Sequence, residues 1–332
     1  MLYFGFMKYL LLIAFPISLR SSGLRFLLLF LLCSNCLLPA ACCFAQLPDC
    51  DIWLFNIKDS AEKTYFSNPE NITHRKGYDN QPAFSPDGKY LLYSSQPDSI
   101  GQIDIYKYEF ATKKITQFTK TPTSEFSPTF MPDPRLNNEV GQGKNISIVM
   151  VENDKDSVQR LWQFPLSPLQ GGDTKCGGCA CIMKNVDSIG YHCWINKDSV
   201  AVFILTKPSF TLQLVNIHSQ KATIVADSIG RCMRMRGKAL WFTVKSGHFN
   251  SVYEYSPGSN SAFLKGIIES EDYCFHAKDQ IWSFSDNAIV LGYMNSKAGA
   301  SEVIDLEKYG ITKPSRIAIS PDGKKMAVVS NK

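Results

Sequence analysis

Short runs of apolar and polar residues, divided by turn residues, fill the chain after residue 50 and predict an all-β protein. Segments such as "KYLLYSS" (89–95) and "ALWFTVK" (239–245) are rich in β-branched, aromatic and aliphatic residues, and residues typical of turns lie between such runs. After residue 50, no long stretch shows the apolar period of about 3.6 residues that a helix requires. We therefore predict strands throughout this region.

One arrangement of strands occurs near both ends of the chain. Residues 82–95 are "PAFSPDGKYLLYSS" and residues 316–330 are "RIAISPDGKKMAVVS". Both contain an apolar strand, a Ser-Pro-Asp-Gly turn, a lysine and a second apolar strand. In such a turn proline presets one backbone angle, aspartate accepts local hydrogen bonds and glycine adopts a positive φ. We therefore assign Asp87 and Asp322 to turn structure and not to catalysis.

The spacing of this pattern predicts a ring of repeated units. Five units of an inner strand followed by three more strands cover residues 81–119, 126–185, 190–227, 230–267 and 272–306. A sixth unit begins at residue 316 with two strands, and segments 51–57 and 70–73 can supply the other two. Units of about 40–50 residues are typical of propeller blades. We predict a six-bladed β-propeller over residues 46–332, whose last blade is completed by the N- and C-terminal strands, a closure that pairs otherwise open edges.

Residues 1–45 differ in composition and predict export. They contain no Asp or Glu, three basic residues precede "FLLLFLLC" (26–33), and small residues follow in "PAACCFAQ" (39–46). A basic region, an apolar region and small residues in this order predict a signal peptide, cleaved after Ala45. Two alternatives stay open: a lipoprotein signal with Cys42 or Cys43 lipidated, and an uncleaved anchor. On each of these readings the chain contacts a membrane only through the leader or a lipid.

The remaining charge is nearly balanced. The whole chain has 35 Lys and Arg against 30 Asp and Glu, and removal of the three basic leader residues leaves 32 against 30. Such a balance gives no basis for a nucleic-acid partner. We therefore predict an exported protein that has no nucleic-acid partner.

The segment "KCGGCACI" (175–182) concentrates three of the seven cysteines that follow the leader. Exported proteins use cysteine mainly in disulfides, so we predict a loop held by a disulfide. One of its thiols is left over, to pair with Cys50 or to stay unpaired. The alternative is a thiol or metal protein built on this segment, although a zinc site needs a fourth ligand and no second Cys-x-x-Cys is present. We predict no resident metal or cofactor. The disulfide or thiol candidates are Cys50, Cys176, Cys179 and Cys181.

Three other cysteines, Cys193, Cys232 and Cys274, occupy one position in the first strands of three successive units. Ala83 occupies the same position in the first unit. A free cysteine behaves as a small buried hydrophobe, so we interpret these residues as packing residues. A thiol cluster near the channel is the alternative.

The first strands of a propeller line its central channel, and basic residues are concentrated in the fourth of them, "GRCMRMRGK" (230–238). We predict a basic patch at the channel mouth that suits an anionic peptide, a carboxylate or a phosphate, because arginine binds such groups through two parallel hydrogen bonds. Alternatively, the arginines reach solvent or pair with acids such as Asp198 or Asp279. The candidate ligand-binding residues are His192, Arg231, Arg234, Arg236 and His276.

The sequence "FSPDGKYLLYSS", followed by "DIYKYE" and "ITQFT", resembles the repeat of TolB-type propellers. The resemblance is strong over 82–119 and 316–330, fair over 126–133, and limited to the strand pattern elsewhere. It implies a periplasmic or outer-membrane-associated bacterial propeller that serves as a protein-binding or scaffold module, with an envelope protein or a peptide bound at one face of the propeller. TolB proteins carry an α/β domain before the propeller, and no pattern for one precedes residue 51 here.

The rival class is a propeller enzyme, a hydrolase, lyase or lactonase with its site in the channel. Such enzymes place a metal or a set of His, Asp and Glu at the axis. The first strands here carry mainly Cys, Arg, Met and aromatic residues, and no Gly-x-Ser-x-Gly elbow is present. We predict a non-catalytic protein and keep the enzyme as the alternative.

Overall fold

The structure, a computed structural model, describes residues 47–60, 63–97, 101–132, 145–151, 158–166, 178–276, 280–293 and 300–332. All of them belong to one compact unit, Leu47–Lys332. The predicted leader, residues 1–45, lies outside the described residues. The described part contains 24 strands and one 3-10 helix, η1 (Glu307–Tyr309), which confirms the all-β prediction. In this part of the chain, no helix has the length and hydropathy needed to span a membrane.

Most strands pair antiparallel with the next strand along the chain, in units of four that we call blades. The first blade contains β3 (Gly77–Phe84), β4 (Tyr90–Pro97), β5 (Asp104–Glu109) and β6 (Lys114–Gln117). The second contains β7 (Glu125–Phe130), β8 (Asn145–Val151), β9 (Gln159–Pro165) and β10 (Ala180–Cys181). The third contains β11 (Ile189–Asn196), β12 (Ser199–Ile204), β13 (Thr211–Asn216) and β14 (Ala222–Asp227). The fourth contains β15 (Ile229–Arg236), β16 (Ala239–Ser246), β17 (Phe249–Tyr255) and β18 (Ala262–Ile268), and the fifth contains β19 (Tyr273–His276), β20 (Gln280–Ser285), β21 (Ala288–Tyr293) and β22 (Ala300–Asp305).

The last blade is built from both ends of the described unit, as predicted. It contains β23 (Pro314–Ile319), β24 (Lys325–Asn331), β1 (Cys50–Asp59) and β2 (Thr64–Asn71). Strands β1 and β24 pair antiparallel from Cys50↔Asn331 to Asn56↔Lys325. One parallel pair, Cys50↔Tyr78, joins this blade to the first, so the two blades together form an eight-stranded sheet.

The outer strand of this blade differs from the prediction. We expected residues 70–73, but β2 spans Thr64–Asn71. The chain reverses directly after β1, where the amide of Ser60 donates to the carbonyl of Lys63 at 2.9 Å. The strand that follows therefore pairs with β1 as a hairpin, from Asp59↔Thr64 onward.

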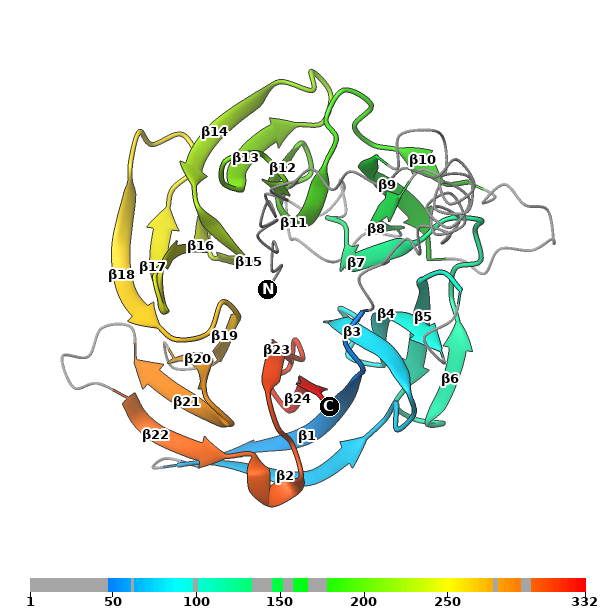
Figure 1. Ribbon diagram of the computed structural model, residues 1–332, viewed down its shortest axis with the longest axis vertical. Helices are drawn as coiled ribbons and strands as arrows, with labels where there is room; N and C mark the ends of the chain where they lie inside the picture. Colours follow the sequence, from blue (N-terminus) through cyan, green and yellow to red (C-terminus); the bar gives the residue numbers. More distant parts are fainter. Residues whose placement is uncertain are drawn as a thin grey trace, which may run out of the picture. The chain divides into compact units, whose positions relative to one another are not determined.

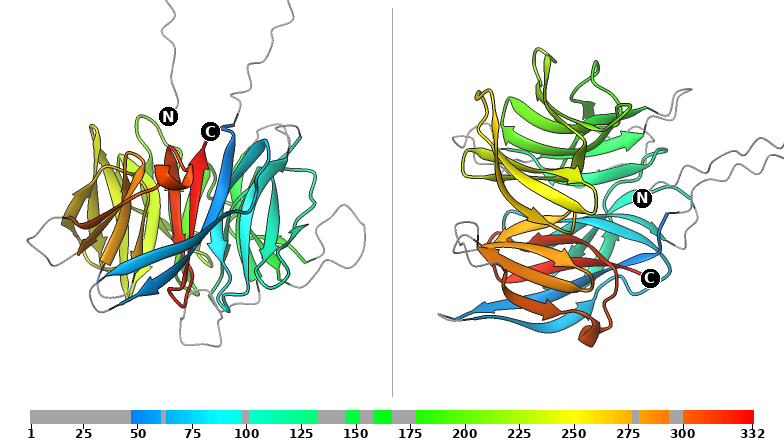
Figure 2. Two further views of the ribbon diagram at one scale, coloured as in Figure 1. Left: turned by 90° about the horizontal axis from the view of Figure 1, so that it is seen from below. Right: turned by 60° about the vertical axis from the view of Figure 1, so that its left-hand side comes forward.

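The blades form a ring around a central axis. Their inner strands β3, β7, β11, β15, β19 and β23 contact one another in this order, and β23 contacts β3. Figure 1 shows these strands around the centre, and Figure 2 shows the same unit from two other directions. This arrangement is that of a β-propeller. When the eight-stranded sheet is divided at its single parallel pair, the blades number six.

The hydrophobic core lies between neighbouring blades. Phe55 of β1 shares one buried cluster with Trp282 of β20 and Val328 of β24, and all three are almost fully buried. Full burial of such a side chain contributes about 1.5–3 kcal/mol. The faces between blades therefore hold the ring together, and they keep each inner strand at a fixed place around the axis.

The two Ser-Pro-Asp-Gly segments form the same turn. Ser85 Oγ donates to Asp87 Oδ1 at 2.7 Å, and Ser320 Oγ donates to Asp322 Oδ1 at the same distance. The glycine of each turn has a positive φ, 66° at Gly88 and 70° in the second copy. The hydrogen bond from Ser320 lowers the pKa of the Asp322 carboxyl. Both aspartates thus have the turn role that the sequence predicted.

One inner-strand position requires glycine for steric reasons. A Cβ at Gly230 of β15 would lie 2.3 Å from Thr243 Oγ1 of β16, and Thr243 is fully buried. We expect Gly230→Ala to lower the free energy of unfolding by about 1–3 kcal/mol, the usual cost of overpacking, as measured by urea denaturation. The matched control is Gly266→Ala in β18, where a Cβ would meet no atom within 4 Å. Equal stability of the two variants would contradict this packing.

Candidate functional site

A cavity of about 430 Å³ occupies the centre of the ring. It is lined by residues from all six inner strands and by residues that directly adjoin them. Because all six inner strands contribute to its lining, the cavity is the central channel of the propeller. The channel is the candidate functional site.

One level of the channel is polar because of a single repeat position. Each inner strand has one small residue at the equivalent position of the repeat: Ala83, Thr129, Cys193, Cys232, Cys274 and Ala318. The position two residues before it holds a polar side chain in five of the six blades, and the fourth blade has Gly230 there, followed by Arg231. All five of these polar residues line the channel. We call them the polar level: Gln81, Ser127, Tyr191, Asp272 and Arg316.

Backbone irregularities accompany the polar level. The pairing of the inner strand with its neighbour shifts register at this height in five blades, in β3, β7, β11, β15 and β23. Gln81 and Ser127 also have positive φ values of 58° and 54°. Bulges re-aim side chains and are over-represented beside active sites. Here they lie at the height where polar side chains face the channel.

Arginine side chains cross the channel at this level. Arg316 Nη2 of β23 donates to the hydroxyl of Tyr191 of β11 at 2.8 Å, and the guanidinium lies 4.8 Å from the centre of the tyrosine ring. Figure 1 shows β23 and β11 on opposite sides of the centre. From β15, Arg231 Nη2 donates to the carbonyl of Ser315 at 2.6 Å and Arg234 Nη2 to that of Ile317 at 3.1 Å.

A buried carboxylate, Asp272, faces these three guanidinium groups. Asp272, with 3% of its side chain exposed, lies 3.4 Å from Arg316, 3.8 Å from Arg234 and 3.9 Å from Arg231. These distances exceed the roughly 2.7–2.9 Å of a strong charge-assisted hydrogen bond. One Asp272 oxygen also accepts the amide of Ile317 at 3.2 Å.

Glu271, the other acid near these arginines, does not change the ratio of three guanidinium groups to one carboxylate. Glu271 is 2.5 Å from Lys245, so these two charges compensate each other. Among the described residues, Arg231, Arg234 and Arg316 therefore share one carboxylate, and the channel carries excess positive charge at the height of the polar level. The Nε of Arg231 is buried, and no described residue offers it a hydrogen-bond acceptor.

The excess charge acts on Tyr191. Burial alone would raise the pKa of its hydroxyl, but the positive charges of Arg316 and Arg231 outweigh burial, and the pKa lies below its ordinary value. An anionic group brought to the same place would experience the same favourable field.

The opposite end of the channel is apolar. The residues that follow the small residue of each inner strand lie further along the same strands, away from the polar level. The channel lining there is hydrophobic. It is formed by Phe84, Phe130, Met235, Phe275 and Ile319. The channel thus changes from charged to apolar along its axis.

The structure brings part of the predicted basic patch together. Arg231 and Arg234 lie in the channel, where they contact Asp272, and not the suggested Asp198, which instead contacts Lys197 and His218. Asp279, the other suggested acid, lies outside the described residues.

His192 lines the channel as an uncharged side chain. Its Nε2 is 2.6 Å from Ser147 Oγ, and burial lowers the pKa of the imidazole to about 3. It is therefore neutral near pH 7 and adds no positive charge to the patch.

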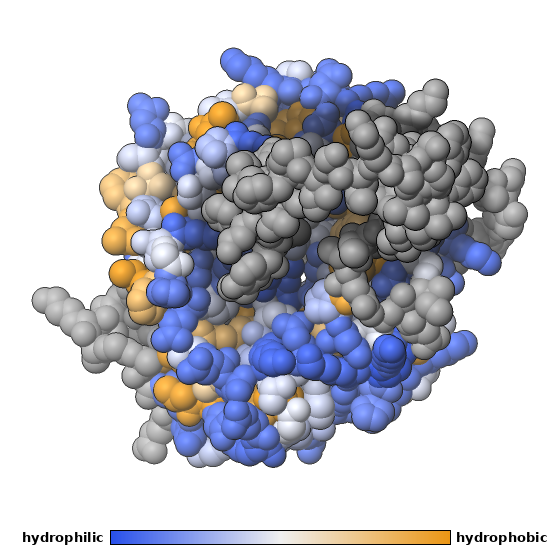
Figure 3. Space-filling view, in the orientation of Figure 1, coloured by the Kyte–Doolittle hydropathy of each residue, from blue (hydrophilic) through white to orange (hydrophobic). Residues whose placement is uncertain are grey.

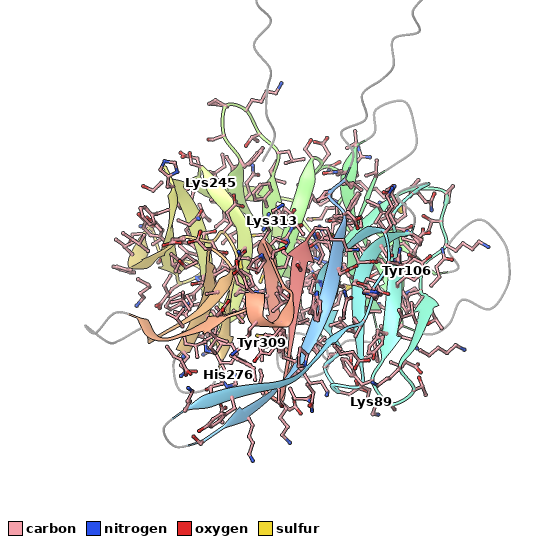
Figure 4. The ribbon with its side chains drawn as sticks, turned by 60° about the horizontal axis from the view of Figure 1, so that its bottom comes forward. Lys89, Tyr106, Lys245, His276, Tyr309 and Lys313 are labelled. Atoms are coloured by element: carbon pink, nitrogen blue, oxygen red, sulfur yellow. The ribbon has the colours of Figure 1, made fainter. Side chains whose placement is uncertain are left out.

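His276 and Arg236 have other neighbours. His276 Nε2 is 2.8 Å from Asp59 of β1, and its ring is 4.3 Å from that of Trp282. Figure 4 shows His276 beside the blue strands β1 and β2. The guanidinium of Arg236 lies 4.9 Å from the centre of the Phe275 ring. Neither His276 nor Arg236 is among the described residues that line the channel.

The cysteines divide into two groups. Cys179 is disulfide-bonded, whereas Cys176 lies outside the described residues. The suggested pairing with Cys50 is wrong, because Cys50 is a buried thiol whose Sγ donates to the carbonyl of Asp79 at 3.3 Å. Cys181 is also a thiol, and its Sγ donates to the carbonyl of Met183 at 3.5 Å. In the described part of the chain, no group of three or more His, Cys, Asp and Glu side chains could hold a metal ion.

The three inner-strand cysteines pack between blades. Cys193, Cys232 and Cys274 belong to three different hydrophobic clusters. Burial raises the pKa of the Cys232 thiol to about 12 and that of Cys193 to about 11. These positions support the packing interpretation, and Cys232 and Cys274 also contribute to the lining of the channel.

Sequence reasoning missed three residues of the site: Tyr191, Asp272 and Arg316. The signal was present, because all three occupy one position of the repeat, two residues before Cys193, Cys274 or Ala318. Alignment of the six first strands by their small residue would have shown that position to be polar. The charge of β15 is concentrated in one strand and stands out in the sequence, whereas the charge of this repeat position is spread over several strands.

The outer rim carries a second feature, an exposed apolar strand. Phe263, Leu264 and Ile267 of β18 each expose more than half of their surface. Figure 3 shows hydrophobic side chains gathered over this strand at the left edge. The rim is far from the channel within the blade, because β18 is the outer strand and β15 the inner one.

No family model matches the chain. A segment of 75 residues is 35% identical to the Tol-Pal system protein TolB of Francisella tularensis, and it covers 23% of this chain and 15% of that protein. Among solved structures, a putative TolB from Agrobacterium tumefaciens is similar with a TM-score of 0.59 at 15% identity, over 86% of this chain and 99% of the other. A chain of the nidogen/laminin complex is similar with a TM-score of 0.57 at 7% identity, over 80% and 97%. These structural similarities bear on the fold, and they agree with the β-propeller.

Proposed function

We propose that the protein is an exported, non-catalytic propeller that binds a protein or peptide partner through its central channel. The observation that carries this proposal is the cluster of three arginines around one carboxylate, Asp272, inside the channel. Guanidinium groups recognise carboxylates and phosphates, and a surrounding wall of low dielectric strengthens their field. The partner therefore presents an anionic group to the polar level.

The size and lining of the channel suit such a ligand. Its volume of about 430 Å³ lies within the roughly 300–1,000 Å³ of ordinary ligand sites. Apolar walls with a few convergent polar groups are also typical of binding sites. A segment of a partner protein could thus bury apolar side chains and a charged group in one place.

The cell envelope is the proposed location. The N-terminal residues have the pattern of an export signal, and the disulfide at Cys179 suits an oxidising compartment. The similar segment of the Francisella protein belongs to a Tol-Pal system protein, which supports an envelope partner for this chain as well.

Affinity capture from the envelope of the native cell tests the proposal. We expect the full chain to capture one specific protein, and Arg234→Gln to reduce capture about tenfold, which corresponds to about 1.4 kcal/mol. Arg234 suits this test because 40% of its side chain is exposed. Lys221→Gln, at an exposed position before β14, is the control. Capture of no protein, or equal capture by the Arg234 variant, would contradict the proposal.

A further inference from the structure

The channel has a charged end, an apolar end and side chains that cross between opposite blades. From these three features we infer that its ligand is a polypeptide C-terminus with an apolar last residue. The terminal carboxylate faces Arg231 and Arg234, and the apolar side chain packs near Met235 and Phe275. This inference rests on the proposed function and specifies which part of the partner enters.

The arginines are held ready for an anion. Arg231 is bound to the carbonyl of Ser315, and Arg234 to those of Tyr273 and Ile317. Their side chains are nevertheless 29% and 40% exposed. Side chains fixed before binding lose little conformational entropy when the ligand arrives. The excess positive charge attracts a carboxylate and repels the amino group of a chain N-terminus.

The contact between Arg316 and Tyr191 favours a chain end over a chain that passes through. It joins β23 to β11 across the channel, with the hydrogen bond of 2.8 Å. An extended segment that continued through the ring would have to break this contact and the bond between Arg231 and Ser315. A terminal carboxylate can stop at this level and leave both in place.

The apolar end specifies the residue that carries the carboxylate. Met235, Phe275 and Ile319 line the channel at this end. Methionine side chains adapt to ligands of different shape. A C-terminal Leu, Ile, Met or Phe places an apolar side chain beside its own carboxylate, as the lining requires.

Two peptide pools test the inference. The immobilised full chain is exposed to random-sequence hexapeptides with a free C-terminal carboxylate, and separately to the same pool with an amidated C-terminus. Mass spectrometry then identifies the retained peptides. We expect at least tenfold greater retention of the free-acid pool, with Leu, Ile, Met or Phe enriched at the last position.

A peptide can offer a carboxylate from its C-terminus or from an Asp or Glu side chain. The amidated pool separates these two sources, because it retains only the side-chain carboxylates. Equal retention of both pools, enrichment of internal acidic residues alone, or no retention of either pool would overturn the inference. A Met235→Glu variant, which adds a negative charge beside the site, should lose the enriched peptides, whereas Lys221→Gln should keep them. If the chain captures a specific envelope protein but shows no preference between the two peptide pools, the proposed function holds and this inference is wrong.

Discussion

An Asp272→Asn variant is expected to lose about 3 kcal/mol of unfolding free energy, because removal of one partner from a buried ion pair leaves the other charge uncompensated. Asp272 is the one carboxylate within 4 Å of Arg231, Arg234 and Arg316 among the described residues. The amide side chain can still accept from Ile317, so the loss reports mainly the charge. Urea denaturation at pH 7 measures it.

Two comparisons make this result specific. Asp198→Asn removes an exposed carboxylate that pairs with Lys197 and His218, and should leave stability nearly unchanged because surface ion pairs are screened by solvent. Added sulfate should restore more stability to the Asp272 variant than to the wild type, because an anion that binds only the folded state stabilises it. If sulfate acts equally on both proteins, the three arginines do not form an anion site.

The second large effect concerns pH and a buried acid between the first two blades. Glu125 of β7 is fully buried and accepts hydrogen bonds from Thr119 and Thr121. Burial, with a smaller contribution from Asp104, raises the pKa of its carboxyl to about 8. The folded protein therefore retains this proton at pH values where the unfolded chain, with an ordinary pKa near 4.5, has lost it.

The sign of the effect follows from this difference. The contribution of Glu125 is fully present below about pH 4.5 and is lost as the pH rises to about 8, at about 1.4 kcal/mol per pH unit. The Glu125→Gln side chain has no proton to lose. The difference in unfolding free energy between this variant and the wild type should therefore grow in favour of the variant from about pH 4.5 to about pH 8, and it should stay constant at higher pH. Urea titrations at pH 5, 7 and 9 measure the difference. The exposed Glu307→Gln is the control, and a difference between Glu125→Gln and wild type that does not change with pH would contradict the raised pKa.

The sequence predicted the repeat and its closure because both depend on local chemistry. Ser-Pro-Asp-Gly turns and alternating apolar strands are encoded within about fifteen residues, and the segment 51–57 was recognisable as a third strand without its partner. The boundary of β2 was missed for an equally local reason, since the hairpin at Ser60–Lys63 has no strong turn signature.

The site was only half predicted because it depends on contacts across the ring. Arg231 and Arg234 stood out as charges in one strand, but their companions Asp272, Arg316 and Tyr191 come from other blades. The polar position of the repeat is a signal for these companions, but it is spread over separate strands and no single strand displays it. His192 and His276 were grouped by residue type, although burial keeps one neutral and Asp59 holds the other away from the channel.

Site-specific photocrosslinking in the native cell envelope tests the central claim most directly. A photoreactive residue at position 235, at the apolar end of the channel, should crosslink to one specific envelope protein, and peptide mapping should place the crosslink near the C-terminus of that protein. The same residue at position 263, on the exposed rim strand β18, should not crosslink to it. A partner captured from position 263 but not from position 235 would contradict a binding site in the channel.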